Sequence, residues 1–457
     1  MISAKRALAI SATIIVAGTS CGPPKPVLFY VPPSVQIDTS SRSARRVSTI
    51  ASTSHSYWEA MSSLDTGYVN RHEVSDTQRD FAKALSLIMN GRHDDAALAF
   101  DEIHAASTDS TIRVASRVLM TAMLQYQDNW KLLAELDSLA RVSKNIDSSD
   151  KAGVESWAIA FRQVAPRQIK FADTQTVLPL SLSVSGVPMI EVTINGKRHT
   201  FWLDTGASMS IVSSNVASDL GMRALTRDTL EVATTTGRVA AQPAQIERLQ
   251  LGTIEVRNTP ALIVASDRML IRLGDQAGVP VVAEIEGVIG FDLISRFDLR
   301  IDYANARVIL ARPGTNVRLP STGINLFWIG TPIVRLVTSK GIPLHFNLDT
   351  GAQETYSTDG LPIKTKARTF RGERRLIGGL AGVTSVHGRF VDELRANMGG
   401  QPMVLRKLMI FIPEVSSFVG LDGILGSDIG KGGVVRIDAT NGLFLIEEAR
   451  RGLRGPS

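Results

Sequence analysis

The chain has 457 residues, a length that allows about three domains at roughly 150 residues each. Hydrophobic residues make up 44% and charged residues 21% of the chain, a balance that excludes a wholly disordered protein. The net charge of +6 is thin over this length and does not indicate a nucleic-acid partner, and the single cysteine excludes intramolecular disulfides and CxxC metal sites.

The first residues have the pattern of an export signal. Lys5 and Arg6 precede an apolar run that is too short to span a membrane and that ends at Gly18-Thr19-Ser20-Cys21. A cysteine in this place resembles a bacterial lipoprotein signal, in which it becomes the acylated N-terminus. We therefore predict a signal over residues 1–21, lipidation at Cys21 and a membrane-anchored protein of the cell envelope or periplasm. Ordinary signal cleavage beside an incidental cysteine is the alternative.

Two segments lie between the predicted signal and the repeated motifs described below. Residues 22–70 begin with a proline-rich and then a Ser/Arg-rich stretch and predict a flexible spacer. Residues 75–168 have the 3.6-residue period of a small helical domain. The expected helices are broken at Asn90-Gly91, and the later apolar face is expected at Val114, Val118, Thr121 and Leu124. This segment resembles a tetratricopeptide hairpin, and it predicts either a surface for a protein partner or a cap packed on the next domain.

An internal repeat is the most informative feature. A strand over 187–194, an Asn-Gly turn and a strand over 199–203 run into D-T-G-A at 204–207. A strand over 331–338, a Lys-Gly turn and a strand over 345–348 run into a second D-T-G-A at 349–352. The same order of strand, turn, strand and motif predicts two copies of one β unit.

The likeness of the two copies continues downstream. Glu286 to Gly290 reads E-G-V-I-G, and Asp422 to Gly426 reads D-G-I-L-G. An Arg-Ile-Asp follows in each copy, with its Asp twelve residues after the last glycine (302 − 290 and 438 − 426). We predict a duplicated β domain with lobes at 177–315 and 320–450. A third D-T-G at residues 65–67 follows no apolar strand and is predicted to be a loop or cap.

Two carboxylates brought together in this way have a defined chemistry. A strand that ends in Asp-Thr-Gly places Asp204 or Asp349 at a sharp backbone turn. Like charges a few ångströms apart do not both ionise, so the pair would hold one proton and titrate as a unit. The charged carboxylate would deprotonate water, and the protonated one would donate to the carbonyl under attack.

These motifs resemble the retropepsin-like aspartic proteases, whose signature is D-T-G-A followed by two apolar residues and Gly. The resemblance covers about residues 177–447 and is nearest to single-chain bacterial members. It implies a mainly β fold of two aspartic-protease-like barrels, a duplicated retropepsin fold, after the small α-helical domain. It implies that Asp204 and Asp349 are catalytic, and that support comes from Thr205, Gly206, Thr350 and Gly351. It also implies a polypeptide substrate, with no cofactor and no metal.

The family covers its substrate with a glycine-bearing hairpin. The candidates are the hairpin at Gly237 in lobe one and the one at Gly378 and Gly379 in lobe two, and the pattern does not choose between them or exclude ordinary turns. Ala207 and Ala352 stand where pepsin-type lobes carry a hydroxyl, which predicts a raised pKa of the pair and an optimum less acidic than that of pepsin.

Two alternatives complete the prediction. The basic stretch between Lys364 and Arg375 predicts a solvated loop face. The other interpretation is contact with an acidic substrate, an anionic lipid or a nucleic acid. The rival function is a catalytically silent peptide-binding or scaffold protein that acts through the helical domain. Two matched acids favour the enzyme, because a binder needs neither.

Overall fold

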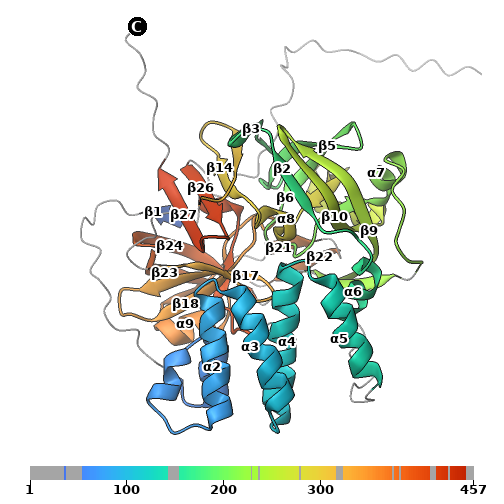
Figure 1. Cartoon of the computed structure of the whole chain (residues 1–457). Helices are drawn as coiled ribbons and strands as arrows, with labels where there is room; N and C mark the ends of the chain where they lie inside the picture. The colour runs from blue at the N-terminus through green and yellow to red at the C-terminus, as the bar shows by residue number, and fades with distance from the viewer. Residues whose placement is uncertain are drawn as a thin grey trace, which may run out of the picture.

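The computed structural model describes residues 35–37, 54–142, 154–227, 229–234, 237–276, 279–314, 323–372, 375–379, 382–386, 388–411, 418–430 and 433–448. Two β lobes stand next to each other, and the helices lie along one side of both (Figure 1). The predicted signal and Cys21 fall outside the described residues. Among the helices that are described, none is both long and apolar enough to cross a membrane.

Lobe one is a nine-stranded sheet within the described residues, with the order β2-β10-β7-β13-β6-β5-β9-β8 and β4 beside β5. A further pairing of β9 with β10 closes six of its strands into a barrel. The strands are β2 (Gln168–Phe171), β4 (Ser181–Leu182), β5 (Pro188–Ile194), β6 (Lys197–Leu203), β7 (Ile211–Ser213), β8 (Leu230–Thr234), β9 (Gly237–Leu251), β10 (Ile254–Val264) and β13 (Gly287–Ile289).

Lobe two repeats this sheet strand for strand. Its order is β1-β24-β19-β25-β18-β17-β23-β20 with β16 beside β17, and the pairing of β23 with β24 closes the barrel. The strands are β1 (Val35–Ile37), β16 (Leu326–Trp328), β17 (Pro332–Thr338), β18 (Pro343–Leu348), β19 (Tyr356–Ser357), β20 (Thr369–Arg371), β23 (Arg389–Met398), β24 (Gln401–Ile410) and β25 (Gly423–Leu425). The predicted duplication is therefore present as matched topology, and the mainly β fold class is confirmed.

A separate sheet joins the lobes. It runs β27-β26-β14-β15-β3, with β3 (Gln175–Pro179), β14 (Asp298–Asp302), β15 (Arg307–Ala311), β26 (Gly433–Asp438) and β27 (Leu443–Glu448). Its middle pair, β14 with β26, comes from different lobes and is antiparallel, so that Asp298 lies opposite Asp438. Arg436 Nε donates to Asp298 at 2.8 Å across this seam. The seam holds the two halves of the chain in one register.

Two hairpins stand apart from the barrels. One, of lobe one, pairs β11 (Leu270–Gln276) with β12 (Val279–Glu284), and the other, of lobe two, pairs β21 (Arg375–Gly379) with β22 (Gly382–Val386). The two hairpins contact each other through β11. Short helical turns complete the lobes: α7 (Ser214–Asp219), η3 (Ser266–Arg268), α8 (Phe291–Ile294), α9 (Gly360–Thr365) and η4 (Ser427–Gly430).

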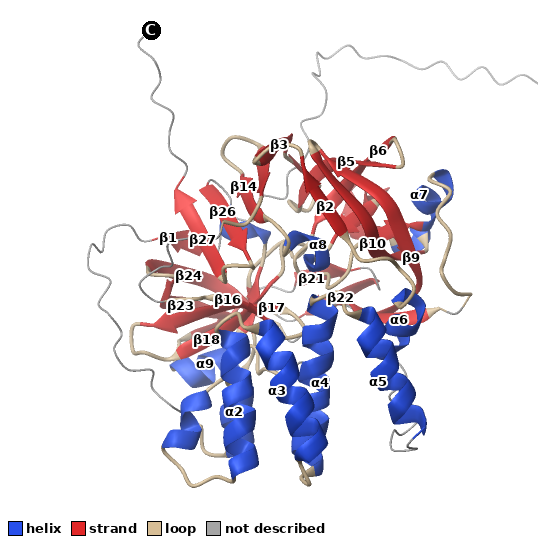
Figure 2. Cartoon of the chain, in the orientation of Figure 1, coloured by secondary structure: helices blue, strands red, loops and turns tan. Residues whose placement is uncertain are grey.

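The N-terminal helices are amphipathic and pack against both lobes, below them in the view of Figure 2. They are α1 (Tyr57–Ser62), η1 (Thr66–Asn70), α2 (Asp76–Met89), α3 (His93–Ala106), α4 (Ser110–Tyr126), α5 (Trp130–Val142) and α6 (Val154–Phe161). Trp328 of lobe two donates from Nε1 to the Ala122 carbonyl at 2.9 Å. One buried apolar cluster runs through the helices and the lobes, so the helical segment packs as a cap.

Three of the sequence predictions fall on this helical region and on β1. The spacer prediction is wrong for residues 54–70, because α1 buries Met61 and η1 buries Val69. It is also wrong at β1, which pairs with β24. The predicted face of α4 is right at Thr121 and Leu124, which are buried, and wrong at Val114 and Val118, which are 65% and 52% exposed. The helix also buries Leu119 and Met123. The third D-T-G lies at the start of a short helix: Asp65 precedes η1, and Thr66 and Gly67 are its first two residues.

Candidate active site

Each lobe delivers one aspartate from the end of a buried strand. β6 ends at Leu203 and is followed by Asp204, and β18 ends at Leu348 and is followed by Asp349. The Asp204 N–H donates to the Ile289 carbonyl at 3.1 Å, and the Asp349 N–H donates to Leu425 at 2.9 Å. The parallel strands β13 and β25 thus hold the two turns, which explains why the apolar residues before Gly290 and Gly426 accompany each D-T-G-A.

The two threonines tie the turns to each other. The Thr205 N–H donates to Thr350 Oγ1 at 3.0 Å, and the Thr350 N–H donates to Thr205 Oγ1 at 2.9 Å. Each hydroxyl in turn donates to a backbone carbonyl of the opposite lobe. Thr205 donates to the Leu348 carbonyl at 2.9 Å, and Thr350 donates to the Leu203 carbonyl at 2.7 Å. Both threonines are buried. These four reciprocal bonds fix one aspartate turn relative to the other.

Glycine at the next position lets the two carboxyl groups meet. A Cβ on Gly206 would overlap the Asp349 carboxyl, and a Cβ on Gly351 would overlap the Asp204 carboxyl. Each glycine of one turn therefore lies against the acid of the other. The structure thereby brings the carboxyl groups of Asp204 and Asp349 close to each other.

Backbone hydrogen bonds and burial change the pKa of the two carboxyls in opposite directions. Asp204 accepts from the N–H groups of Gly206 at 2.8 Å and Ala207 at 3.2 Å, and Asp349 accepts from Ala352 at 2.9 Å. These bonds favour the ionised form. Burial outweighs them and raises the pKa of both carboxyls, and the charge of Asp204 raises the pKa of Asp349 further. The pair is therefore set to keep one proton above the pH at which an ordinary Asp loses it.

In each lobe, a hydroxyl residue and a second aspartate form hydrogen bonds next to the aspartate turn. Ser210 donates to Asp292 at 2.9 Å and accepts from the Gly290 N–H at 3.1 Å. In lobe two, Thr355 donates to Asp428 at 2.6 Å and accepts from the Gly426 N–H at 3.1 Å. Asp292 and Asp428 are thus structural.

Asp302 and Asp438 are structural in a different way, because each holds a turn. Asp302 accepts from Asn305, and Asp438 accepts from Asn441.

Sequence reasoning missed the hydroxyls and the strand-end acids. Ser210 and Thr355 both stand six residues after the aspartate (210 − 204 and 355 − 349), so alignment of the two copies would have found them. Glu286 accepts from the Thr200 N–H at 2.7 Å, and Asp422 accepts from the His345 N–H at 2.8 Å, an equivalent bond in each lobe. Lys364, assigned to the solvated face, instead pairs with buried Asp422 at 3.0 Å, and that part of the prediction is wrong.

The candidate hairpins lie in different settings. Gly237 begins β9 with φ of +144°, a conformation that favours glycine, and pairs with Thr234 of β8. Gly378 and Gly379 end β21, in the hairpin that contacts β11 of the other lobe. Among the described residues, no three His, Cys, Asp or Glu side chains gather as metal ligands would.

Comparison with known proteins supports a likeness to the retropepsin-like aspartic proteases. Residues 190–275, within lobe one, match the family described as gag-polyprotein putative aspartyl protease. A retropepsin-like aspartic protease from Rickettsia conorii matches at 22% identity over 32% of this chain and 94% of its own, with a TM-score of 0.20 that is too low to carry an argument. A search of curated proteins finds no significant relative. The family match indicates aspartic protease activity and covers a minor part of the chain.

Proposed function

We propose that the protein is an aspartic endopeptidase in which Asp204 and Asp349 activate water. The reciprocal turn geometry carries this proposal: each glycine lies against the opposite carboxyl, and each threonine binds the opposite backbone. A structural role alone does not account for two acids held together, because their mutual repulsion and burial both oppose ionisation. Such an arrangement is costly to stability and useful for proton transfer.

The reaction follows from one shared proton. The ionised carboxyl takes a proton from water as the water oxygen bonds to the peptide carbonyl carbon, and the protonated carboxyl donates to the carbonyl oxygen. The tetrahedral diol then collapses: the newly protonated carboxyl donates its proton to the amide nitrogen and the C–N bond breaks. The other carboxylate takes the proton of one diol hydroxyl as that oxygen becomes the carbonyl of the new carboxylic acid. The pair ends with one proton, as it began. Thr205 and Thr350 hold the carboxyls in place and exchange no proton with the substrate.

Two further parts of the proposal concern access and location. The β21–β22 hairpin is the better-supported cover for the substrate, because it reaches from lobe two to contact β11 of lobe one. The N-terminal pattern supports export and anchoring through Cys21. Mass spectrometry of the mature N-terminus distinguishes a lipidated Cys21 from ordinary cleavage.

The test is hydrolysis of an unstructured protein by the purified full chain across pH 3–8, with Asp204→Asn and Asp349→Asn alongside. We expect each variant to lose at least about 10³-fold in kcat while it keeps its far-UV circular dichroism, because the two acids act as one unit. We also expect the optimum to lie above pH 4, since the pKa of the pair is raised. Inert wild-type protein, or variants that cleave equally well, would leave the silent peptide-binding alternative.

A further inference from the structure

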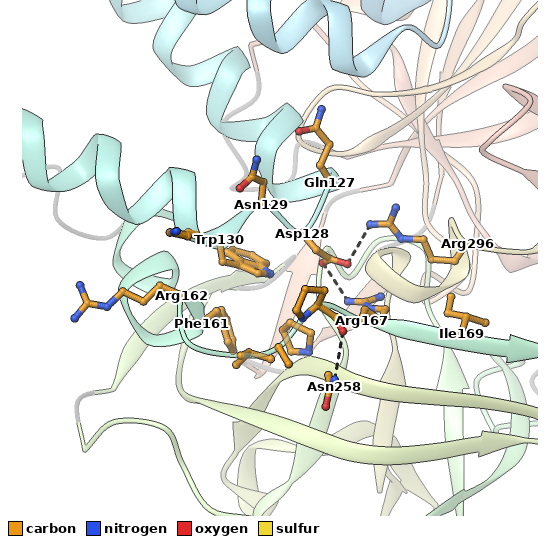
Figure 3. A pocket seen from close by; sticks show the side chains of 15 residues that line it. Gln127, Asp128, Asn129, Trp130, Phe161, Arg162, Arg167, Ile169, Asn258 and Arg296 are labelled. Atoms are coloured by element: carbon orange, nitrogen blue, oxygen red, sulfur yellow. Dashed lines mark hydrogen bonds and ion pairs between the residues drawn. The ribbon is translucent and has the colours of Figure 1, made fainter.

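A cavity of about 460 Å³ lies where the helical segment meets lobe one, and neither Asp204 nor Asp349 lines it (Figure 3). Its walls come from the turn between α4 and α5, the segment between α6 and β2, and the strand β10. Its volume falls within the range of small-molecule sites.

The lining combines apolar walls with an excess of positive charge. Trp130, Phe161 and Pro260 supply apolar surface. Lys131, Arg162, Arg167 and Arg296 also line the cavity, against the single acid Asp128. Asp128 pairs with Arg167 at 3.2 Å and with Arg296 at 3.3 Å, so Lys131 and Arg162 are left as the excess charge of the lining. A cavity of this kind favours an anion carried on an apolar body.

Two buried N–H donors in the lining have no acceptor among the residues that the structure describes. Trp130 is 5% exposed, and its indole Nε1 finds no hydrogen-bond partner. The Arg167 side chain is 4% exposed, and its Nε also has none, although its terminal nitrogens bind Asp128 and Asp292. In Figure 3 the Trp130 ring faces the cavity and Arg167 lies on the opposite side. A buried donor without an acceptor is unfavourable, and a ligand oxygen would relieve it.

We propose that this cavity is a binding site for a carboxylate attached to an aromatic or aliphatic body. The carboxylate would accept from Trp130 Nε1 and Arg167 Nε, and its apolar part would lie against Phe161 and Pro260. Lys131 and Arg162 would attract the anion. The ligand is a free organic acid or the C-terminal carboxylate of a peptide, since both present the same group.

Isothermal titration of the full chain tests the chemistry with phenylacetate and its neutral isostere phenylacetamide. We expect the acid to bind at least about tenfold more tightly, because a charged acceptor strengthens both hydrogen bonds. N-acetyl-Gly-Phe as free acid and as amide forms the second arm. Tighter binding of the peptide acid assigns a peptide terminus, and tighter binding of phenylacetate assigns a free acid.

Variants test the site. Trp130→Phe keeps the ring and removes the donor, and we expect it to weaken acid binding about five- to tenfold. Trp157→Phe is the matched control, because Trp157 is a buried tryptophan of α6 that does not line the cavity, and we expect less than a twofold change. Lys131→Gln should weaken binding about threefold and reduce its salt dependence. The proposal is overturned if neither acid binds at millimolar concentration, if acid and amide bind equally, or if both tryptophan variants weaken binding equally.

Discussion

The two lobes share their strand order and differ in how deeply they bury the same polar positions. In lobe one, Glu286 accepts a strand N–H at a site where its side chain is 44% exposed. In lobe two, Asp422 makes the equivalent bond with a side chain that is 6% exposed. Burial raises the pKa of Asp422, and the neighbouring Lys364 opposes that rise.

The strand that precedes each aspartate differs in the same way. His345 of lobe two is fully buried where lobe one has exposed Thr200, four residues before each aspartate (349 − 345 and 204 − 200). The polar bonds that set the backbone path are thus the same in both copies, and the solvent around them is not. The common bonds are the ones that position the aspartates, and the rest of each lobe is free to diverge.

Outside the aspartates themselves, the largest expected effect is a loss in kcat/KM that tests whether the two aspartate turns are equivalent. Gly206→Ala and Gly351→Ala each place a methyl group on the opposite carboxyl, so we expect each to lose at least about 10²-fold in kcat/KM through misplacement of that carboxyl. Gly360→Ala is the control, because its nearest neighbour is 3.8 Å away and its φ is ordinary. The assay is peptide hydrolysis, with circular dichroism for folding. Loss in only one of the two variants would show that the turns are not equivalent.

The second effect is a loss in the free energy of unfolding, which compares the buried Asp422 with the exposed Glu286. Asp422→Asn keeps an acceptor for His345 but leaves Lys364 partly buried without its counter-charge, so we expect a loss of about 2–3 kcal/mol in the free energy of unfolding. Glu286→Gln removes an exposed charge from the equivalent position, and we expect a loss below about 1 kcal/mol. Urea unfolding of both variants at pH 7 provides the measurement. Equal losses would contradict the proposed difference in burial.

The smallest effect concerns pH and His345. Burial lowers the pKa of His345 to about 3, so the unfolded chain gains a proton near pH 6.5 that the folded chain does not take up. Stability from this group is full above pH 6.5 and is lost as the pH falls, by about 1–2 kcal/mol between pH 7 and 5.

The variant His345→Thr, which installs the residue of lobe one, should flatten that slope. The raised pKa values of the aspartate pair change stability with pH in the opposite direction, and they do so equally in the wild type and in the variant. The difference between the two curves of stability against pH therefore isolates His345. Parallel curves from chemical denaturation at each pH would contradict the assignment.

The sequence predicted what local pattern encodes and missed what depends on distant partners. The two D-T-G-A motifs, the strands before them and the later V-I-G and I-L-G segments were read correctly, because their alternation and order repeat within one chain. The pairing of β1 with β24 was missed because three residues contain no periodic signal and the partner lies more than 350 positions away. The face of α4 was misassigned at Val114 and Val118 because both fit one helical stripe, while packing on the lobes selects another.

The seam between β14 and β26 determines how the proposed enzyme would respond to dilution. Because Asp298 meets Asp438 within one polypeptide, the halves of the site stay at a high effective concentration however few molecules are present. An enzyme that assembles its site from two separate chains loses turnover per molecule once it is diluted below its dissociation constant. Here turnover per molecule should be the same at nanomolar and micromolar protein, so a single isolated copy would carry full activity.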